Sequence, residues 1–287
     1  GDTLQLDIDW EVTLPQRGAG RMGHSDKEVY FVAYWFPKMG VFDNLRGWSA
    51  QPYLGNAEFY DEFGDYEVSI SVPSGWTVMA TGELQNPDDV FSAITLDQLE
   101  AAATSDTLVT IADAASRGAG TVTAEGVDGW LTYEFSARNV RDFAWTTSNV
   151  QRWDATSAEV ANQIWPAADS AASDEDEEAE DDSRDDRTTE ITGPIQPIVD
   201  GTRRVLVHSF WREDVAPLWS EQWLYGKQSI EFHSDYTGYA YPWSHMTSVE
   251  GMDIIEGGME FPMMTVMGAY QDQEPSDLFN VTSHEIG

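Results

Sequence analysis

The stretch "DYEVSISVPSGWTVMATGEL", residues 65–84, indicates most directly which fold class the chain adopts. Apolar and polar side chains alternate from Tyr66 to Val72, as is typical of a half-buried strand in an antiparallel sheet. The turn-forming sequence Pro-Ser-Gly follows, and a second β-type run begins at Trp76. The stretch therefore predicts a β-hairpin and a mainly β fold.

The sequence on either side extends this pattern. Strict alternation predicts a strand over residues 4–14, and a β-branched and aromatic run predicts a buried strand over 29–37. A second hairpin is expected over 121–137, and short helices over 96–103 and 108–115. The first ~165 residues thus read as an all-β unit with one helical excursion.

Helical periodicity becomes more frequent after about residue 203. A strand is expected over 203–211 and a helix over 216–238. A last helix is expected over 276–287, with Ser276 as its cap and Leu278, Val281 and His284 on one face. These patterns predict an amino-terminal β-domain over 1–203 and the start of an α+β domain over 204–287.

The composition limits the classes of partner. The 287 residues include 51 acidic and 15 basic side chains, a formal net charge of −36, and no cysteine. Nucleic acids and anionic membranes would be repelled, and thiolate metal sites are excluded. No apolar run approaches the ~18 residues of a membrane span. Acid spread through the whole chain, with almost no lysine, is typical of a salt-adapted protein.

One segment concentrates this charge. Ten of the thirteen residues from 174 to 186 are acidic. Residues 167–193 are therefore expected to form a solvated, disordered insert, since like charges repel and there is little to bury. Binding of a cation or a partner is the alternative, although no Asp-x-Asp-x-Asp-Gly calcium spacing is present. The chain begins at Gly1 without a leader. A targeting signal has therefore been removed or was never present, and removal would imply a periplasmic or secreted location.

The candidate chemistry begins with His284 and Glu285, the first half of a His-Glu-x-x-His pattern whose second histidine would fall just past Gly287. In that pattern two histidines one helical turn apart bind a single Zn²⁺. The glutamate takes a proton from the zinc-bound water. A His-Glu pair alone is weak evidence, because such a pair is also an ordinary feature of a helix surface.

A second element is "EGGMEFP", residues 256–262. Gly257 and Gly258 allow a backbone such as that of a peptide to approach closely. Met259 is expected in the core or in a pocket wall. Glu260 is a carboxylate in an apolar strand, where a cation such as a peptide α-ammonium would be a natural partner; the alternative is a water-exposed glutamate at a strand edge.

Taken together, the Gly-Gly-Met-Glu strand and the His-Glu pair 24 residues after Glu260 resemble the M1 family of zinc aminopeptidases. The segments "YFVAYWFPKMGVFDN", "FSARNVRDFAW" and "YAYPW" are also similar to that family. The resemblance implies a saddle-like antiparallel β-domain followed by a thermolysin-like α+β catalytic domain that is truncated here. It also implies a peptide substrate.

The resemblance also implies a role for each matched residue. His284 would be the first zinc ligand and Glu285 the general base. Gly257, Gly258 and Met259 would line the substrate backbone. Glu260 would hold the free amino terminus, with Glu58 of the β-domain as a candidate second carboxylate beside it.

The sequence departs from the family pattern in two respects. Phe261 stands where the family has asparagine, and the remaining zinc ligands would lie beyond Gly287. The chain is therefore expected to bind zinc weakly or not at all and to be inactive alone. His24, His208, His233 and His245 read as ordinary surface or core histidines. Two alternatives to the enzyme remain: a non-catalytic M1-like scaffold, and a free-standing β-sandwich binding module.

Overall fold

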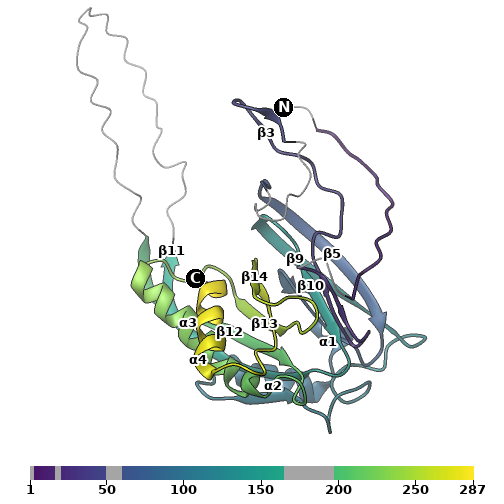
Figure 1. Cartoon of the computed structure of the whole chain (residues 1–287), viewed down its shortest axis with the longest axis vertical. Helices are drawn as coiled ribbons and strands as arrows, with labels where there is room; N and C mark the ends of the chain where they lie inside the picture. Colours follow the sequence, from purple (N-terminus) through teal and green to yellow (C-terminus); the bar gives the residue numbers. More distant parts are fainter. Residues whose placement is uncertain (1–2, 17–20, 50–59, 165–196) are drawn as a thin grey trace, which may run out of the picture.

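The structure is a computed structural model that describes residues 3–16, 21–49, 60–164 and 197–287. It is mainly β, with several antiparallel sheets and a smaller number of helices (Figure 1). The prediction of a mainly β fold with an α+β part is confirmed at this level. The acidic insert and Glu58 lie outside the described residues.

Three antiparallel sheets are formed by the first part of the chain. One contains β1 (Gly23–Ser25), β2 (Val29–Val32), β10 (Trp145–Ser148) and β6 (Thr77–Ala80), in that order. A second contains β5 (Gly64–Pro73), β9 (Trp130–Val140) and β7 (Glu83–Leu84). A two-stranded sheet joins β3 (Phe42–Asp43) to β4 (Gly47–Trp48).

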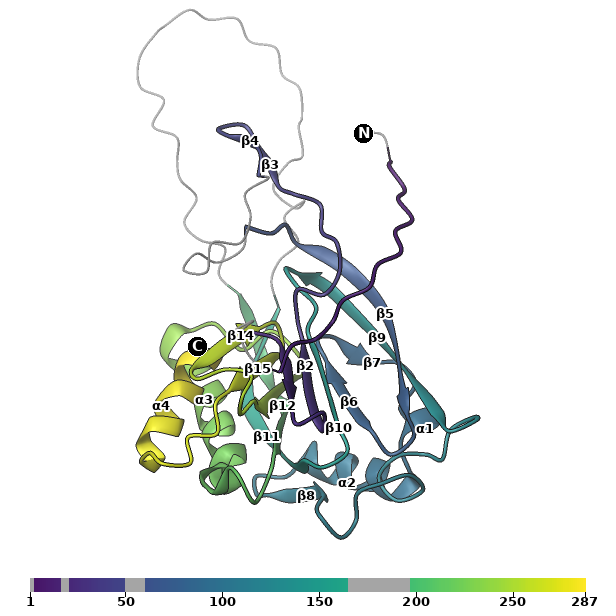
Figure 2. The ribbon, with the colours of Figure 1, turned by 45° about the vertical axis from the view of Figure 1, so that its right-hand side comes forward.

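The stretch over residues 65–84 contains both predicted strands and the predicted turn, but it is not a hairpin. The turn is closed by a hydrogen bond from the Trp76 amide to the Pro73 carbonyl (3.1 Å), and Gly75 has φ +87°, which suits glycine. However, β5 pairs with β9, whereas β6 pairs with β10. The turn is therefore a corner between two sheets, visible in Figure 2 where β5 and β6 diverge.

The largest sheet has six strands in the order β14-β15-β13-β12-β11-β8. Its strands are β8 (Val109–Ala112), β11 (Arg152–Ile164), β12 (Ile198–Trp211), β13 (His245–Glu250), β14 (Gly258–Phe261) and β15 (Met264–Met267). Pairing is parallel between β12 and β13 and between β13 and β15, and antiparallel elsewhere. The expected domain boundary near residue 203 falls inside β12, which pairs with β11 along its whole length.

The helices are α1 (Pro87–Val90), α2 (Ala93–Ala102), the 3₁₀ helix η2 (Pro217–Glu221), α3 (Gln222–Thr237) and α4 (Pro275–Ile286). Ser92 caps α2 by accepting from the Thr95 amide (3.2 Å). Gly238 ends α3 with φ +72°, the left-handed conformation of a helix C-terminus.

Three further predictions from local pattern were wrong. Residues 108–115 are not helical, because β8 within this range pairs with the edge of β11. Residues 121–125 form no strand, and β9 pairs with β5 instead. Residues 4–14 are extended but pair with no strand of the described chain, so that Leu4 is 74% exposed. In each case the available partner strand, rather than the local pattern, decides the structure.

Side chains from several sheets build the main core. Tyr133 of β9, Val78 of β6 and Trp153 of β11 are buried in one cluster. The Tyr133 hydroxyl donates to the Trp76 carbonyl (3.0 Å), and Trp153 stacks on Phe210 with ring centroids 5.1 Å apart. This shared core holds the first sheets against the six-stranded sheet, which carries the candidate site.

Candidate active site

The Gly-Gly-Met-Glu strand and the His-Glu helix lie in direct contact. Gly258 begins β14, the edge strand of the six-stranded sheet, and Glu285 lies in the last turn of α4. A Cβ built on Gly258 would lie 2.3 Å from Glu285 Oε1 and 2.4 Å from its Cδ. The Glu285 side chain therefore occupies the space that any other residue at 258 would fill. A Cβ on Gly257 would meet nothing within 4 Å.

Along β14, apolar side chains and the carboxylate of Glu260 point to opposite faces of the sheet. Met259 and Phe261 are buried in a cluster with Phe31 and Val249, whereas Glu260 between them is exposed. Successive residues of a strand point to opposite faces, so the carboxylate of Glu260 is directed away from that cluster. Among the described residues Glu260 makes no ion pair.

A pocket of about 380 Å³ brings the predicted residues together. Glu260, His284 and Glu285 all line it, with Arg141 and Tyr241 on other parts of the wall. His284 is exposed, and Glu285 is 8% exposed. The sequence prediction that these three residues share one site is consistent with this arrangement, whereas Gly257 and Met259 lie outside the lining of this pocket.

Contacts with α3 fix the position of α4. The Thr282 hydroxyl lies 3.0 Å from Gln222 Oε1, and Nε2 of His233 lies 2.9 Å from the Ser283 carbonyl. The buried positions are Leu278, Thr282 and Glu285. Of the predicted face, Leu278 is buried and Val281 is half-buried against the same cluster, whereas His284 is exposed.

The helix also begins differently from the sequence prediction. Glu274, not Ser276, is the N-cap, and Pro275 occupies the first turn. Glu274 and Asp277 form a reciprocal capping box, in which the Glu274 amide donates to Asp277 Oδ2 (3.1 Å).

Two aspartates that the sequence analysis did not select lie beside Glu260. Asp61 and Asp142 line an adjoining pocket of about 160 Å³ that Glu260 and Arg141 also line. Lys38 Nζ lies 2.8 Å from Asp61 Oδ2 and 3.1 Å from Asp142 Oδ2. Asp61 lies three residues after Glu58, and Asp142 lies in "FSARNVRDFAW", one of the segments similar to the M1 family. Sequence alone does not show that these two stretches meet at β14.

Burial and charge have opposite effects on the Asp142 carboxyl. Its pKa is raised, mainly by burial, although Lys38 and a hydrogen bond from the Phe143 amide lower it in part. The pKa of the nearby Tyr66 hydroxyl is also raised, by burial first and then by the charges of Asp142 and Asp61. The β-domain thus presents two aspartates, paired with Lys38, and Arg141 to the Glu260 side.

Of the histidines expected to be ordinary, His208 lies deep in the core, and His245 lies beside it and is half-buried. His208 of β12 is 3% exposed, and burial, together with the neighbouring His245, lowers its pKa well below the ordinary value. Burial also lowers the pKa of His245, which begins β13. Neither residue lines the pocket that contains Glu260 and Glu285.

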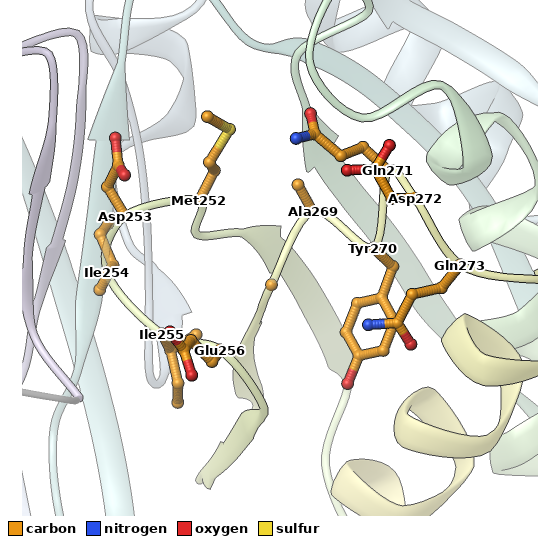
Figure 3. A pocket seen from close by; sticks show the side chains of 11 residues that line it. Met252, Asp253, Ile254, Ile255, Glu256, Ala269, Tyr270, Gln271, Asp272 and Gln273 are labelled. Atoms are coloured by element: carbon orange, nitrogen blue, oxygen red, sulfur yellow. The ribbon is translucent and has the colours of Figure 1, made fainter.

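A larger hollow, about 820 Å³, has neither His284 nor Glu260 in its lining. Its walls are the loop that precedes β14 and the loop between β15 and α4. Figure 3 shows Met252 to Glu256 on one side and Ala269 to Gln273 on the other. The two walls face each other across an open gap, and none of the residues selected by motif with a catalytic role lines it, so this hollow is not our candidate site.

The described residues contain no group of three or more His, Asp or Glu side chains arranged to hold a metal ion. They contain no helix long and apolar enough to cross a membrane. No protein-family model matches the sequence, and no curated protein matches it either. The assignment of function therefore rests on the residues and their geometry.

Proposed function

We propose that this chain is the amino-terminal portion of a zinc aminopeptidase of the M1 type, which hydrolyses amino-terminal residues from peptides. The observation that carries the proposal is the contact between Glu285 and Gly258. It joins the two sequence elements that resemble the family, although 27 positions separate these residues (285 − 258). Two motifs with unrelated roles would not be expected to pack so closely that position 258 accepts only glycine.

The proposed role of Glu260 follows from its charge and exposure. Its carboxylate lies at a pocket wall without an ion pair among the described residues. A peptide α-ammonium group offers a charge-assisted hydrogen bond there, whereas an internal peptide bond offers no charge. This difference would select free amino termini.

Glu285 would serve as the general base that removes a proton from the attacking water. A general base must lie within hydrogen-bond reach of the proton that it removes. Glu285 lines the same pocket as Glu260, which we propose as the amine anchor. Because Gly258 lacks a side chain, the carboxylate packs directly on the strand along which the substrate backbone would lie.

The zinc ion itself does not fit the residues present. His284 supplies one imidazole, whereas a catalytic zinc site needs three protein ligands. A zinc ion, where bound, would activate the attacking water. The proposal thus requires a longer protein with a second histidine three residues after Glu285, and it expects a saddle-like β-domain and a thermolysin-like catalytic domain.

The decisive experiment uses the protein extended by roughly 200 residues, a typical domain length, in high salt. We expect bound zinc and hydrolysis of aminoacyl anilides, with turnover reduced by about 10²-fold or more in Glu285→Gln. Zinc-free, inactive protein that nevertheless binds peptides would favour the non-catalytic scaffold instead.

A second experiment tests the amine anchor. Glu260→Gln should raise KM for substrates with a free amino terminus by about tenfold or more, because a charged hydrogen bond is lost. The matched control is Glu256→Gln, an exposed glutamate outside the pocket that contains Glu260. Equal effects of the two substitutions would refute the role of Glu260.

A further inference from the structure

A second, apolar pocket of about 240 Å³ lies in the core region shared by the sheets. Its walls include Val78, Phe91 and Phe135 from the amino-terminal sheets and helices, and Trp153 from β11. It shares no lining residue with the candidate active site, and the inference below does not depend on the proposed function. Half-buried Leu84 and Leu99 and exposed Glu83 contribute to the lining, so the pocket is open to solvent on that side.

The only imidazoles in this lining belong to His208 and His245, whose ring centroids are 6.1 Å apart. The indole Nε1 of Trp153 donates a hydrogen bond to Nδ1 of His208 (3.1 Å). An indole N–H can only donate, so His208 Nδ1 is unprotonated and the proton of the neutral ring lies on Nε2.

The hydrogen bond of His245 fixes the same tautomer in its own ring. Its Nε2 lies 2.8 Å from the carbonyl oxygen of Gly82. A carbonyl can only accept, so Nε2 carries the proton, and the neutral ring, favoured by burial, has a bare acceptor at Nδ1. This Nδ1 atom is buried and has no hydrogen-bond partner among the described residues.

An unpaired buried acceptor is costly, because it has lost its water without gaining a protein donor. Here it belongs to a residue that lines an apolar pocket. A pocket of this size accepts a molecule as large as a single ring, since an apolar cavity of about 150 Å³ already holds benzene. A charged ligand would lose its hydration in such surroundings.

We propose that this pocket binds an uncharged, ring-sized apolar molecule that carries one hydroxyl group, of the phenol class, and that the hydroxyl donates to Nδ1 of His245. The ring replaces water against Val78, Phe91 and Phe135, and the hydroxyl satisfies the unpaired acceptor of His245. Selectivity follows from the same contact: an equally apolar ring without a hydroxyl leaves Nδ1 unpaired.

Phenol and toluene are matched probes, to be titrated calorimetrically into the full chain in high and low salt. In a pocket without an available acceptor, phenol would bind less tightly than toluene, because its hydroxyl would be desolvated without compensation. We expect phenol to bind at least as tightly as toluene. In His245→Leu, phenol binding should weaken about tenfold or more while toluene binding is retained. His24→Leu, far along the chain on β1, is the control and should change neither affinity.

A measurement on the unmodified chain avoids the risk that His245→Leu folds poorly. With ¹⁵N-labelled histidine, phenol should shift the Nδ1 resonance of His245 in the direction of a hydrogen-bonded imine nitrogen and leave that of His24 unchanged. Tighter binding of toluene than of phenol, no binding of phenol at millimolar concentration, or phenol binding without a shift at His245 would each overturn the proposal.

Discussion

The candidate active site and the apolar pocket that we propose binds a phenol each contain histidine, but in contrasting surroundings. His284 is exposed at the end of α4, beside two carboxylates and a pocket of about 380 Å³. His245 is half-buried, and its pocket of about 240 Å³ is lined mostly by apolar groups. An exposed imidazole can exchange protons and ligands, whereas a buried neutral one acts as a fixed hydrogen-bonding group. The surroundings, rather than the residue type, decide which chemistry each histidine can perform.

The largest expected effect concerns the contact that builds the candidate active site. Gly258→Val should lower the free energy of unfolding by about 2–3 kcal/mol, because a side chain at 258 must displace Glu285. Urea denaturation in high salt measures this. Gly257→Val is the control, since nothing lies within 4 Å of its Cβ position, and it should cost about 1 kcal/mol or less. Equal losses would mean that Gly258 is not packed against Glu285.

Lys38→Met tests the pairing of Lys38 with the two aspartates beside Glu260. Without the lysine, the buried Asp142 carboxylate loses its cation, and we expect a loss of about 1–3 kcal/mol at pH 7. The pKa of Asp142 is already raised by burial and should rise further, so the loss should shrink as acid protonates the carboxyl. Lys27→Met, on an exposed turn, should change stability by less than about 0.5 kcal/mol. A loss that does not depend on pH would contradict the pairing.

The buried histidines predict a dependence of stability on pH. The pKa values of His208 and His245 are lowered in the folded protein, so the unfolded chain binds more protons as the pH falls below 6.5. Their contribution to stability is therefore present above that pH and is lost below it, by up to about 1.4 kcal/mol per pH unit for each group. His245→Phe should reduce the slope of unfolding free energy between pH 7 and pH 5. The substitution His24→Phe should leave it unchanged, and an unaltered slope in His245→Phe would refute the assignment.

The smallest effect concerns the start of α4. Asp277→Ala removes half of the capping box with Glu274 and should cost about 0.5–1 kcal/mol. Ser276→Ala should be nearly neutral, because Ser276 is not the cap. Thermal unfolding of both variants measures the difference, and the reverse ranking would restore the cap predicted from the sequence.

Local pattern predicted most elements but few of their partners. The strands β5, β9 and β12 and the helices α3 and α4 lie where periodicity predicted them. The hairpin over 65–84 was wrong because a turn signal reports a change of direction and not which strand lies alongside. Residues 108–115 were assigned to a helix because the free edge of β11, which recruits β8, is not visible in local sequence.

The candidate site shows the same limit. Glu260, His284 and Glu285 were selected by motif, and one pocket contains all three. Asp61 and Asp142 were missed because each looks like an ordinary acidic residue in a chain with 51 of them. Only the folded arrangement brings them to the side of Glu260. The outward orientation of His284 was also missed, because it depends on how α4 packs against α3.

The long pairing of β11 with β12 has a consequence for how this protein can vary. Ile164 and Ile198 are register partners, so the two ends of the segment between them are held side by side by the ladder. Doubling the length of such a segment costs only about 0.6 kcal/mol in closure entropy. Mutation can therefore lengthen, shorten or recharge this acidic stretch without shifting the strands that carry the two pockets. Changes of net charge in this stretch are in this way separated from the maintenance of the fold.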